Sequence, residues 1–123
     1  MPYQFADHQR YIEFRLYGVV EGRDLPGNGW IDRVIGNGRL LLDASEVEAV
    51  TADVLFLADF VRSVQLRGSF RTAVVAPSPL VFGIFRQVFA YRGELPHAAP
   101  VEFFRARDPA EAWLLGLREA PGA

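Results

Sequence analysis

Two hydroxyl side chains stand just before segments of this sequence that are predicted to be helices. Ser78 is followed by Pro79 and an apolar segment, and Thr51 is followed by Asp53 and a second such segment. A hydroxyl becomes a nucleophile when a base activates it, so an enzyme using Ser78 or Thr51 with a loop histidine is one hypothesis. No base can be assigned to either hydroxyl from the sequence, and the residue pattern predicts no catalytic residue. The protein is therefore expected not to be an enzyme.

Ser78 has a second possible role. The free amides at the start of a helix attract anions, so Ser78 is a candidate to bind a small anion beside them, although an ordinary N-cap needs the same residue. Asp43 ends a predicted strand and lies where α/β folds place ligands. His8 and His97 are the histidines of the chain, both in polar loops without a second ligand at metal spacing. We expect surface histidines, no metal site and no cofactor.

Composition excludes several classes of protein. The chain has 123 residues, a formal charge of -2 and no cysteine, so disulfides and thiolate sites are excluded and no cationic face for nucleic acid is expected. Half of the residues are hydrophobic, as in a globular protein, yet no apolar run is long enough to span a membrane. The first ten residues lack the apolar core of a signal peptide, so a soluble cytoplasmic protein is expected.

Strands and helices are predicted from hydrophobic periodicity. The clearest unit is a buried strand at 72–76 that leads into a helix ending at Tyr91, with Ser78 as N-cap and Pro79 in the first position. Thr51 is expected to cap a helix that ends near Leu66, and Asp108 to cap the last helix. The remaining strands are expected at 3–5, 10–17, 39–43 and 101–105, a short helix at 30–35, and an acidic crossover loop at 44–50.

This order predicts an α/β sandwich in one domain, 1–123, with a core of about 10–117. Its sheet is expected to have four to five mostly parallel strands, with an antiparallel strand at the edge and about four helices.

Two of the predicted helices carry more apolar surface than one sheet face can cover. Leu55, Phe56 and Phe60 lie outside or at the margin of the core stripe of the helix after Thr51, and the following helix is apolar over more than half of its circumference. The side chains in question on that following helix are Phe82, Phe85 and Phe89. They could contact a neighbouring helix, a second copy of the chain, a partner protein or an apolar ligand in an internal pocket.

Several short motifs, in this order and spacing, resemble the SpoIIAA-like family of small bacterial proteins, which has the STAS-type fold of anti-sigma-factor antagonists. The motifs are Tyr17-Gly18, Leu41-Leu42-Asp43, the segment 71–76, Val81-Phe82-Gly83, Phe85-Arg86, Phe104-Arg105 and the segment 111–114. The resemblance implies a STAS-like sandwich and a regulatory, non-catalytic protein. In the antagonists a serine at the start of the second helix is phosphorylated to switch partner binding. At that place Thr51 is the residue that could accept phosphate, although the family's glycine is missing, so Thr51 is a phospho-switch candidate.

Two functions from different classes compete. The first is a regulatory module that acts through protein–protein contact, with another protein or with itself as a homodimer, and the resemblance and the wide apolar faces favour it. The second is a carrier or sensor that holds a lipid or small apolar ligand in a pocket lined by the helix of Phe82, Phe85 and Phe89. The resemblance of the family to lipid-transfer folds favours this second function.

Overall fold

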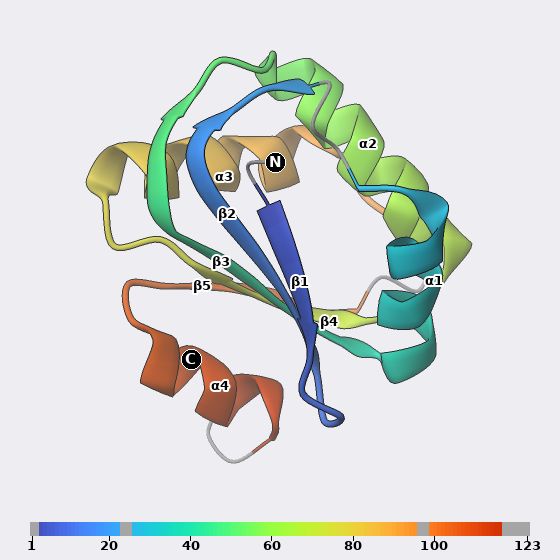
Figure 1. Ribbon diagram of the computed structural model, residues 1–123. Helices are drawn as coiled ribbons and strands as arrows, with labels where there is room; N and C mark the ends of the chain where they lie inside the picture. The colour runs from blue at the N-terminus through green and yellow to red at the C-terminus, as the bar shows by residue number, and fades with distance from the viewer. Residues whose placement is uncertain (1–2, 23–25, 96–98, 117–123) are drawn as a thin grey trace.

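The computed structural model describes residues 3–22, 26–95 and 99–116, which form one five-stranded sheet with four helices (Figure 1). The elements in chain order are β1 Tyr3–Asp7, β2 Ile12–Val20, α1 Asn28–Asn37, β3 Arg39–Val50, α2 Val54–Arg67, β4 Arg71–Val75, α3 Pro79–Tyr91, β5 Val101–Phe104 and α4 Arg107–Leu114. The predicted fold class is confirmed. Within the described part of the chain, no helix is both long and apolar enough to cross a membrane.

The strands lie side by side in the order in which they occur in the chain, β1-β2-β3-β4-β5. The pair β1–β2 is antiparallel, with Phe5 opposite Phe14, and the other three pairs are parallel. In the parallel part, Leu40 of β3 stands opposite Thr72 of β4. The predicted antiparallel edge strand and the parallel remainder are therefore both present.

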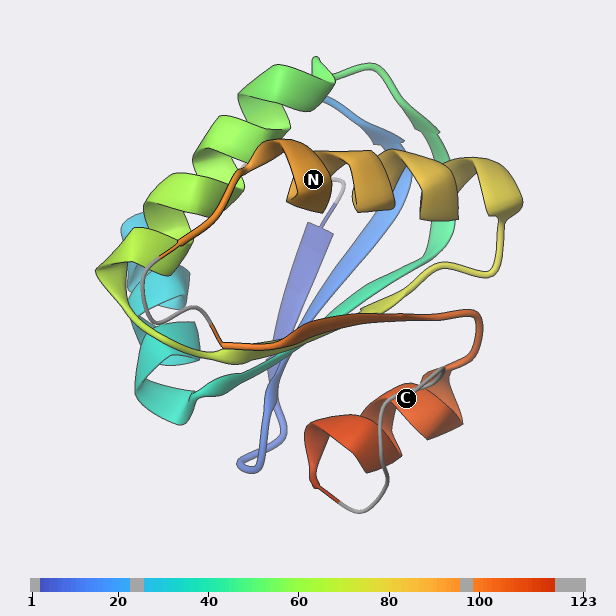
Figure 2. The ribbon, with the colours of Figure 1, turned by 180° about the vertical axis from the view of Figure 1, so that it is seen from behind.

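The strand order determines where the helices lie. Each of α1, α2 and α3 connects one parallel strand to its immediate neighbour, and such crossovers are almost always right-handed, which places all three helices on the same face. Figures 1 and 2 show α2 and α3 on one side of the sheet and α4 on the other. Within the described residues, one face of the sheet is therefore covered by three helices and the opposite face by α4.

Each face has its own hydrophobic core. On the three-helix face, Phe14, Leu42 and Val74 of the sheet pack against α2 and α3, and a smaller group joins Ile12 to Val34 of α1 and to Phe70. On the other face, Leu41, Ala73, Val75 and Phe104 pack against residues of α4. The α4 residues in this core are Ala110, Trp113 and Leu114. Successive residues of β3 and β4 thus point into different cores, as a strand covered on both faces requires.

The predicted loop at 44–50 is wrong, because β3 continues to Val50. Val47 is buried while Glu46 and Glu48 are exposed, which is the alternation of a strand with one solvated face. Irregular pairing with β2 after Asp43 shifts the register, as at a β-bulge, so Ser45 and Glu46 are both exposed. Asp43 consequently lies inside a strand and not at its end.

Two of the three predicted helix caps are also wrong. Helix α2 is capped by Asp53, whose Oδ1 accepts hydrogen bonds from the amides of Leu55 and Phe56, and not by Thr51. Helix α4 begins at Arg107 after Ala106, so Asp108 lies in its first turn, where its charge complements the helix dipole. The prediction for α3 is confirmed, since Ser78 is the N-cap and Pro79 the first residue.

Candidate functional site

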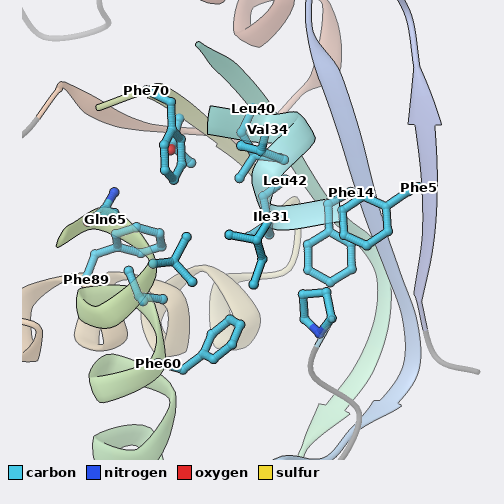
Figure 3. Close-up of a pocket in the computed structure, with 14 residues that line it drawn as sticks. Phe5, Phe14, Ile31, Val34, Leu40, Leu42, Phe60, Gln65, Phe70 and Phe89 are labelled. Carbon is cyan, nitrogen blue, oxygen red and sulfur yellow. The ribbon is translucent and has the colours of Figure 1, made fainter. Parts of the chain in front are cut away.

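An apolar cavity lies between the three-helix face of the sheet and helices α1 and α2 (Figure 3). Its volume is about 80 Å³, and 14 residues line it. The sheet side is formed by Phe5, Phe14, Leu40, Leu42 and Thr72, with Phe70 just before β4. The helix side is formed by Ile31 and Val34 of α1, by Phe60, Val61, Val64 and Gln65 of α2, and by Phe89 of α3, with Pro26 completing the lining.

Stacked aromatic rings form one wall of this cavity. The ring of Phe5 lies between those of Phe14 and Trp30, with a centroid distance of 4.5 Å to each and nearly parallel planes. Strand β1 brings Phe5 to this wall because its antiparallel register sets Phe5 opposite Phe14. Offset-stacked rings attract each other beyond the gain from burial alone, so we expect this wall to be rigid.

Two polar side chains belong to the lining, and they differ in their partners. The amide oxygen of Gln65 accepts a hydrogen bond from Nη1 of Arg92, so this group is satisfied. Thr72 is 1% exposed, and its Oγ1 has no hydrogen-bond partner in the part of the chain that the structure describes. A buried hydroxyl without a partner costs about 1–3 kcal/mol of stability.

A second cavity of about 60 Å³ lies beside the first, towards α3. Five residues line both cavities, namely Phe14, Leu42, Phe60, Val61 and Phe89, so the two spaces share a wall. The second cavity adds Phe85 and Val88 of α3 to the lining. Helix α3 therefore contributes to both spaces, but most of the lining comes from the sheet and α2.

The chemistry of the lining favours binding over bond-making. Among the described residues, no carboxylate, imidazole or amine lines either cavity, so none of the described lining groups can take up or release a proton near neutral pH. Apolar walls with one or two polar groups are typical of sites for small molecules.

A cluster of charged residues on the opposite face of the sheet is the second candidate for function. Glu13 of β2 and Asp43 of β3 are both 4% exposed, and Arg107 of α4 reaches them. The guanidinium binds the Glu13 carboxylate through two contacts, Nη2 to Oε1 at 2.7 Å and Nη1 to Oε2 at 3.1 Å, and lies 3.4 Å from Oδ2 of Asp43. Arg107 Nη2 also donates to the hydroxyl of Tyr11 at 3.2 Å, and burial raises the pKa of that phenol.

Every carboxylate oxygen in this cluster has a partner. Oε1 of Glu13 also contacts Nε2 of His8 at 2.8 Å, and Oε2 contacts Nη2 of Arg15 at 3.1 Å. Oδ1 of Asp43 accepts from the amide and the hydroxyl of Ser45. The hydrogen bonds from Arg107 hold the pKa of Glu13 at about 2, against the opposing effect of desolvation. A carboxylate with so low a pKa is a weak base, so the cluster fastens α4 to the sheet and is not arranged for proton transfer.

The two predicted hydroxyl sites lie at exposed positions apart from this cluster and the cavities. Thr51 follows β3, and its amide donates to the carbonyl of Val20 at 3.0 Å. The α2 amides that a phosphate on Thr51 would meet already bind Asp53. Ser78 caps α3, with its hydroxyl oxygen accepting from the amide of Val81 at 3.4 Å. Phosphorylation of Thr51 and anion binding at Ser78 stay predictions.

The six predicted apolar contact residues separate into three groups. Phe85 and Phe89 are buried against the sheet and line the cavities, and Phe60 is half-buried and lines both. Phe82 is half-buried and lines neither cavity, since its ring packs edge-on against Phe103 and beneath the guanidinium of Arg105. The last group is exposed, with Leu55 at 64% and Phe56 at 52%.

The histidines do not form a metal site among the described residues. His8 is exposed, stacks on Tyr11 and binds Glu13, and His97 lies outside the described residues. No group of three or more potential metal ligands occurs in the described parts of the chain.

Sequence reasoning missed Thr72, Gln65 and Arg107. The sequence contains a signal for Thr72, because it is the one polar residue in the run 72–76, which is predicted to be buried. A polar residue at such a position is a candidate for a specific role. Arg107 carries no such signal, since its partner Glu13 is 94 residues away in the chain.

Comparison with known proteins identifies the fold. A solved structure from Shewanella loihica PV-4, described as an uncharacterized protein from the DUF3478 family with a SpoIIAA-like fold, is similar to this chain with a TM-score of 0.56. The similarity covers 91% of each chain at 16% sequence identity. No family model and no curated protein matches the sequence. The chain thus has a SpoIIAA-like fold, as the resemblance of its motifs implied.

Proposed function

We propose that this protein is a non-catalytic binding module that holds a small apolar molecule between the sheet and helices α1 and α2. The observation that carries this proposal is the cavity of about 80 Å³, whose lining is apolar except for Thr72 and Gln65. An apolar space of roughly 150 Å³ stays dry and accepts benzene, so a cavity of about 80 Å³ limits the ligand to a molecule no larger than a single ring. Long acyl chains exceed this size.

The proposal is tested by measuring benzene binding to the unmodified protein and to variants with one residue of α2 replaced. Val64 lines the cavity, so Val64→Phe should fill it and abolish benzene binding detected by ligand-observed NMR. Leu66→Phe is the matched control, because Leu66 is an exposed residue of the same helix and lines neither cavity. Thermal unfolding checks that both variants fold. Absence of benzene binding to the unmodified protein, or equal binding by both variants, would contradict the proposal.

A second candidate function, recognition of another protein or of a second copy of this chain, is supported by the first turn of α2. Leu55 and Phe56 are adjacent there, and both are more than half exposed. Exposed large apolar side chains that lie together favour an interface. Size-exclusion chromatography with light scattering should then show an oligomer that the double change Leu55→Gln and Phe56→Gln disrupts. Leu80→Gln on α3 is the control, since Leu80 is equally exposed. A strict monomer that retains no partner protein would count against this function.

A further inference from the structure

The β1 edge of the sheet is covered by side chains of α1. The ring of Phe5 lies between those of Phe14 and Trp30, so Trp30 lies on the outer side of β1. The ring centres of Phe5 and Trp30 are 4.5 Å apart, close to the spacing of neighbouring strands, so Trp30 occupies the place of a side chain from a further strand. Arg33 lies 4.8 Å from the centre of the Trp30 ring and pairs with Asp7 at the end of β1. A further strand cannot pair with β1 without displacing these side chains.

No described strand pairs with the outer side of β5, the last strand of the sheet. On its inner side, the carbonyls of Pro100 and Phe104 accept hydrogen bonds from the amides of β4 and of the residue that follows it, at 3.1 and 2.9 Å. Backbone groups of a strand point alternately to its two sides, so the N–H and C=O groups of Val101 and Phe103 point outward. Free backbone groups at a sheet edge are a template for pairing with another chain.

Two arginines border this edge on the three-helix face. The guanidinium of Arg86 lies 5.7 Å from the ring centre of Phe103, and that of Arg105 lies 4.5 Å from the ring centre of Phe82, which packs edge-on against Phe103. Both arginines are exposed, and within the described residues no carboxylate pairs with either of them. Glu102 belongs to the opposite face, since successive residues of a strand alternate. The edge therefore combines two half-buried aromatic rings with two positive charges that lack a carboxylate partner.

We propose that the β5 edge binds an extended, acidic segment of another protein, which adds a further strand to the sheet. Main-chain hydrogen bonds to Val101 and Phe103 supply affinity, and carboxylates facing Arg86 and Arg105 supply selectivity, the usual division of roles when a strand is added. A second copy of the chain fits less well. Two β5 strands paired antiparallel about a two-fold axis share the three-helix face, so the copy brings further arginines to that face and no carboxylate of β5.

This inference goes beyond the proposed function, because no residue of β5 lines either cavity. The experiment uses three pentapeptides with blocked ends and follows the protein amides by NMR titration. The first peptide alternates Glu with Val, the second is the same peptide with every main-chain nitrogen methylated, and the third has Lys in place of Glu. The Glu-Val peptide should bind, with the largest shift changes at Val101 and Phe103. The methylated peptide has no main-chain donor and the Lys peptide meets like charges, so both should bind more weakly.

Two kinds of variant separate the charges from the strand edge. Arg86→Gln with Arg105→Gln should weaken binding of the Glu-Val peptide by roughly 2- to 30-fold, the range for two exposed ion pairs. The matched control, Arg10→Gln with Arg33→Gln, removes two exposed charges on the β1 side and should leave the affinity nearly unchanged. Val101→Pro deletes one outward N–H at the first residue of an edge strand, where proline is tolerated, and should weaken binding by roughly 2- to 12-fold. Thermal unfolding checks that all variants fold.

The inference is overturned if the Glu-Val peptide causes no shift changes in β5 at millimolar concentration. Equal binding of the methylated peptide also overturns it, because this result means adsorption of an acid and not strand addition. Equal affinities of the two double variants have the same consequence. If light scattering shows a dimer that Val101→Pro dissociates, a second copy and not an acidic segment occupies the edge. Benzene binding at the cavity is measured separately, so the proposed function stands or fails independently of these results.

Discussion

Nη2 of Arg107 lies 2.7 Å from Oε1 of Glu13, so the first residue of α4 is bound to a strand 94 residues earlier in the chain. Together with the contact from Nη1 to Oε2, this makes a bidentate ion pair, the geometry in which arginine binds carboxylates most strongly. Helix α4 has eight residues and, in the part of the chain that the structure describes, no other helix covers its face of the sheet. Its attachment therefore depends both on its apolar core and on this pair.

Acid should weaken the fold through Glu13. Its pKa is about 2 in the folded protein, against 4.5 for an ordinary glutamate such as that of the unfolded chain, so the carboxylate contributes stability above pH 4.5 that is lost as the pH falls towards 2. The shift corresponds to roughly 3 kcal/mol. Urea unfolding between pH 7 and pH 2.5 should show this loss, and Glu13→Gln should be less stable at pH 7 but flatter with pH.

The control for the acid experiment is Glu46→Gln, which removes one carboxylate on the exposed side of β3, outside the cluster. If Glu13→Gln follows the same pH dependence as the unmodified protein, the ion pair with Arg107 does not set the acid sensitivity.

Removal of Arg107 should be costly. Arg107→Ala removes one of the two arginines that contact both Glu13 and Asp43, and Arg15 remains. The free energy of unfolding should fall by about 3 kcal/mol, near the low end for broken buried pairs, because the Arg107 side chain is itself 31% exposed and Arg15 still contacts both carboxylates. Arg33→Ala breaks an exposed pair with Asp7 and should cost less than ~1 kcal/mol. Urea unfolding at pH 7 measures both values, and equal costs would contradict the role assigned to Arg107.

Replacing two glycines by alanine should change the stability of the protein in opposite directions. A Cβ at Gly68 would lie 2.4 Å from Cγ2 of Ile35, so Gly68→Ala forces apart the end of α2 and α1 and should destabilise the protein by about 1–3 kcal/mol. Gly83 is an exposed residue inside α3 with open space around its Cα, so Gly83→Ala should stabilise by roughly 0.5–1 kcal/mol. Thermal unfolding tests both changes in stability. Adding Ile35→Ala to Gly68→Ala should remove the clash and restore part of the lost stability.

The cap of α2 can be assigned by mutation. Asp53→Ala removes the acceptor for two helix amides and should cost about 1 kcal/mol. Thr51→Ala removes one long hydrogen bond to the carbonyl of Val20, 3.4 Å, and should cost less than ~0.5 kcal/mol. Chemical unfolding of the two variants compares them, and a larger effect at Thr51 would restore the role predicted from the sequence.

The sequence predicted a structural element well where all the residues that determine it lie in one short segment. Ser78 and Pro79 mark the start of α3 because a cap and a preorganised first residue act within a few residues of each other. Residues 44–50 were wrongly predicted to be a loop because the prediction considered this segment without its neighbours. Their acidic side chains resemble a loop, but here they point to the side of β3 that α4 leaves uncovered.

The candidate site was much less predictable. The wide apolar surface of α2 and α3 indicated that something had to be covered, and Phe60, Phe85 and Phe89 do line the cavities. Thr72 and Phe70 join them from the sheet side, and no local pattern relates these residues to α2. A cavity exists because side chains from several elements fail to fill a space, which is a property of three-dimensional packing and not of any segment.

The agreement between strand order and chain order has a consequence for synthesis on the ribosome. Each parallel strand that emerges finds its neighbour already made and adds to an open edge, so no strand has to insert between two finished ones. The growing edge passes from β2 to β3, β4 and β5 in turn. Helix α4 follows β5 in the chain, so the nascent sheet carries Glu13 and Asp43 without Arg107 until that helix has emerged.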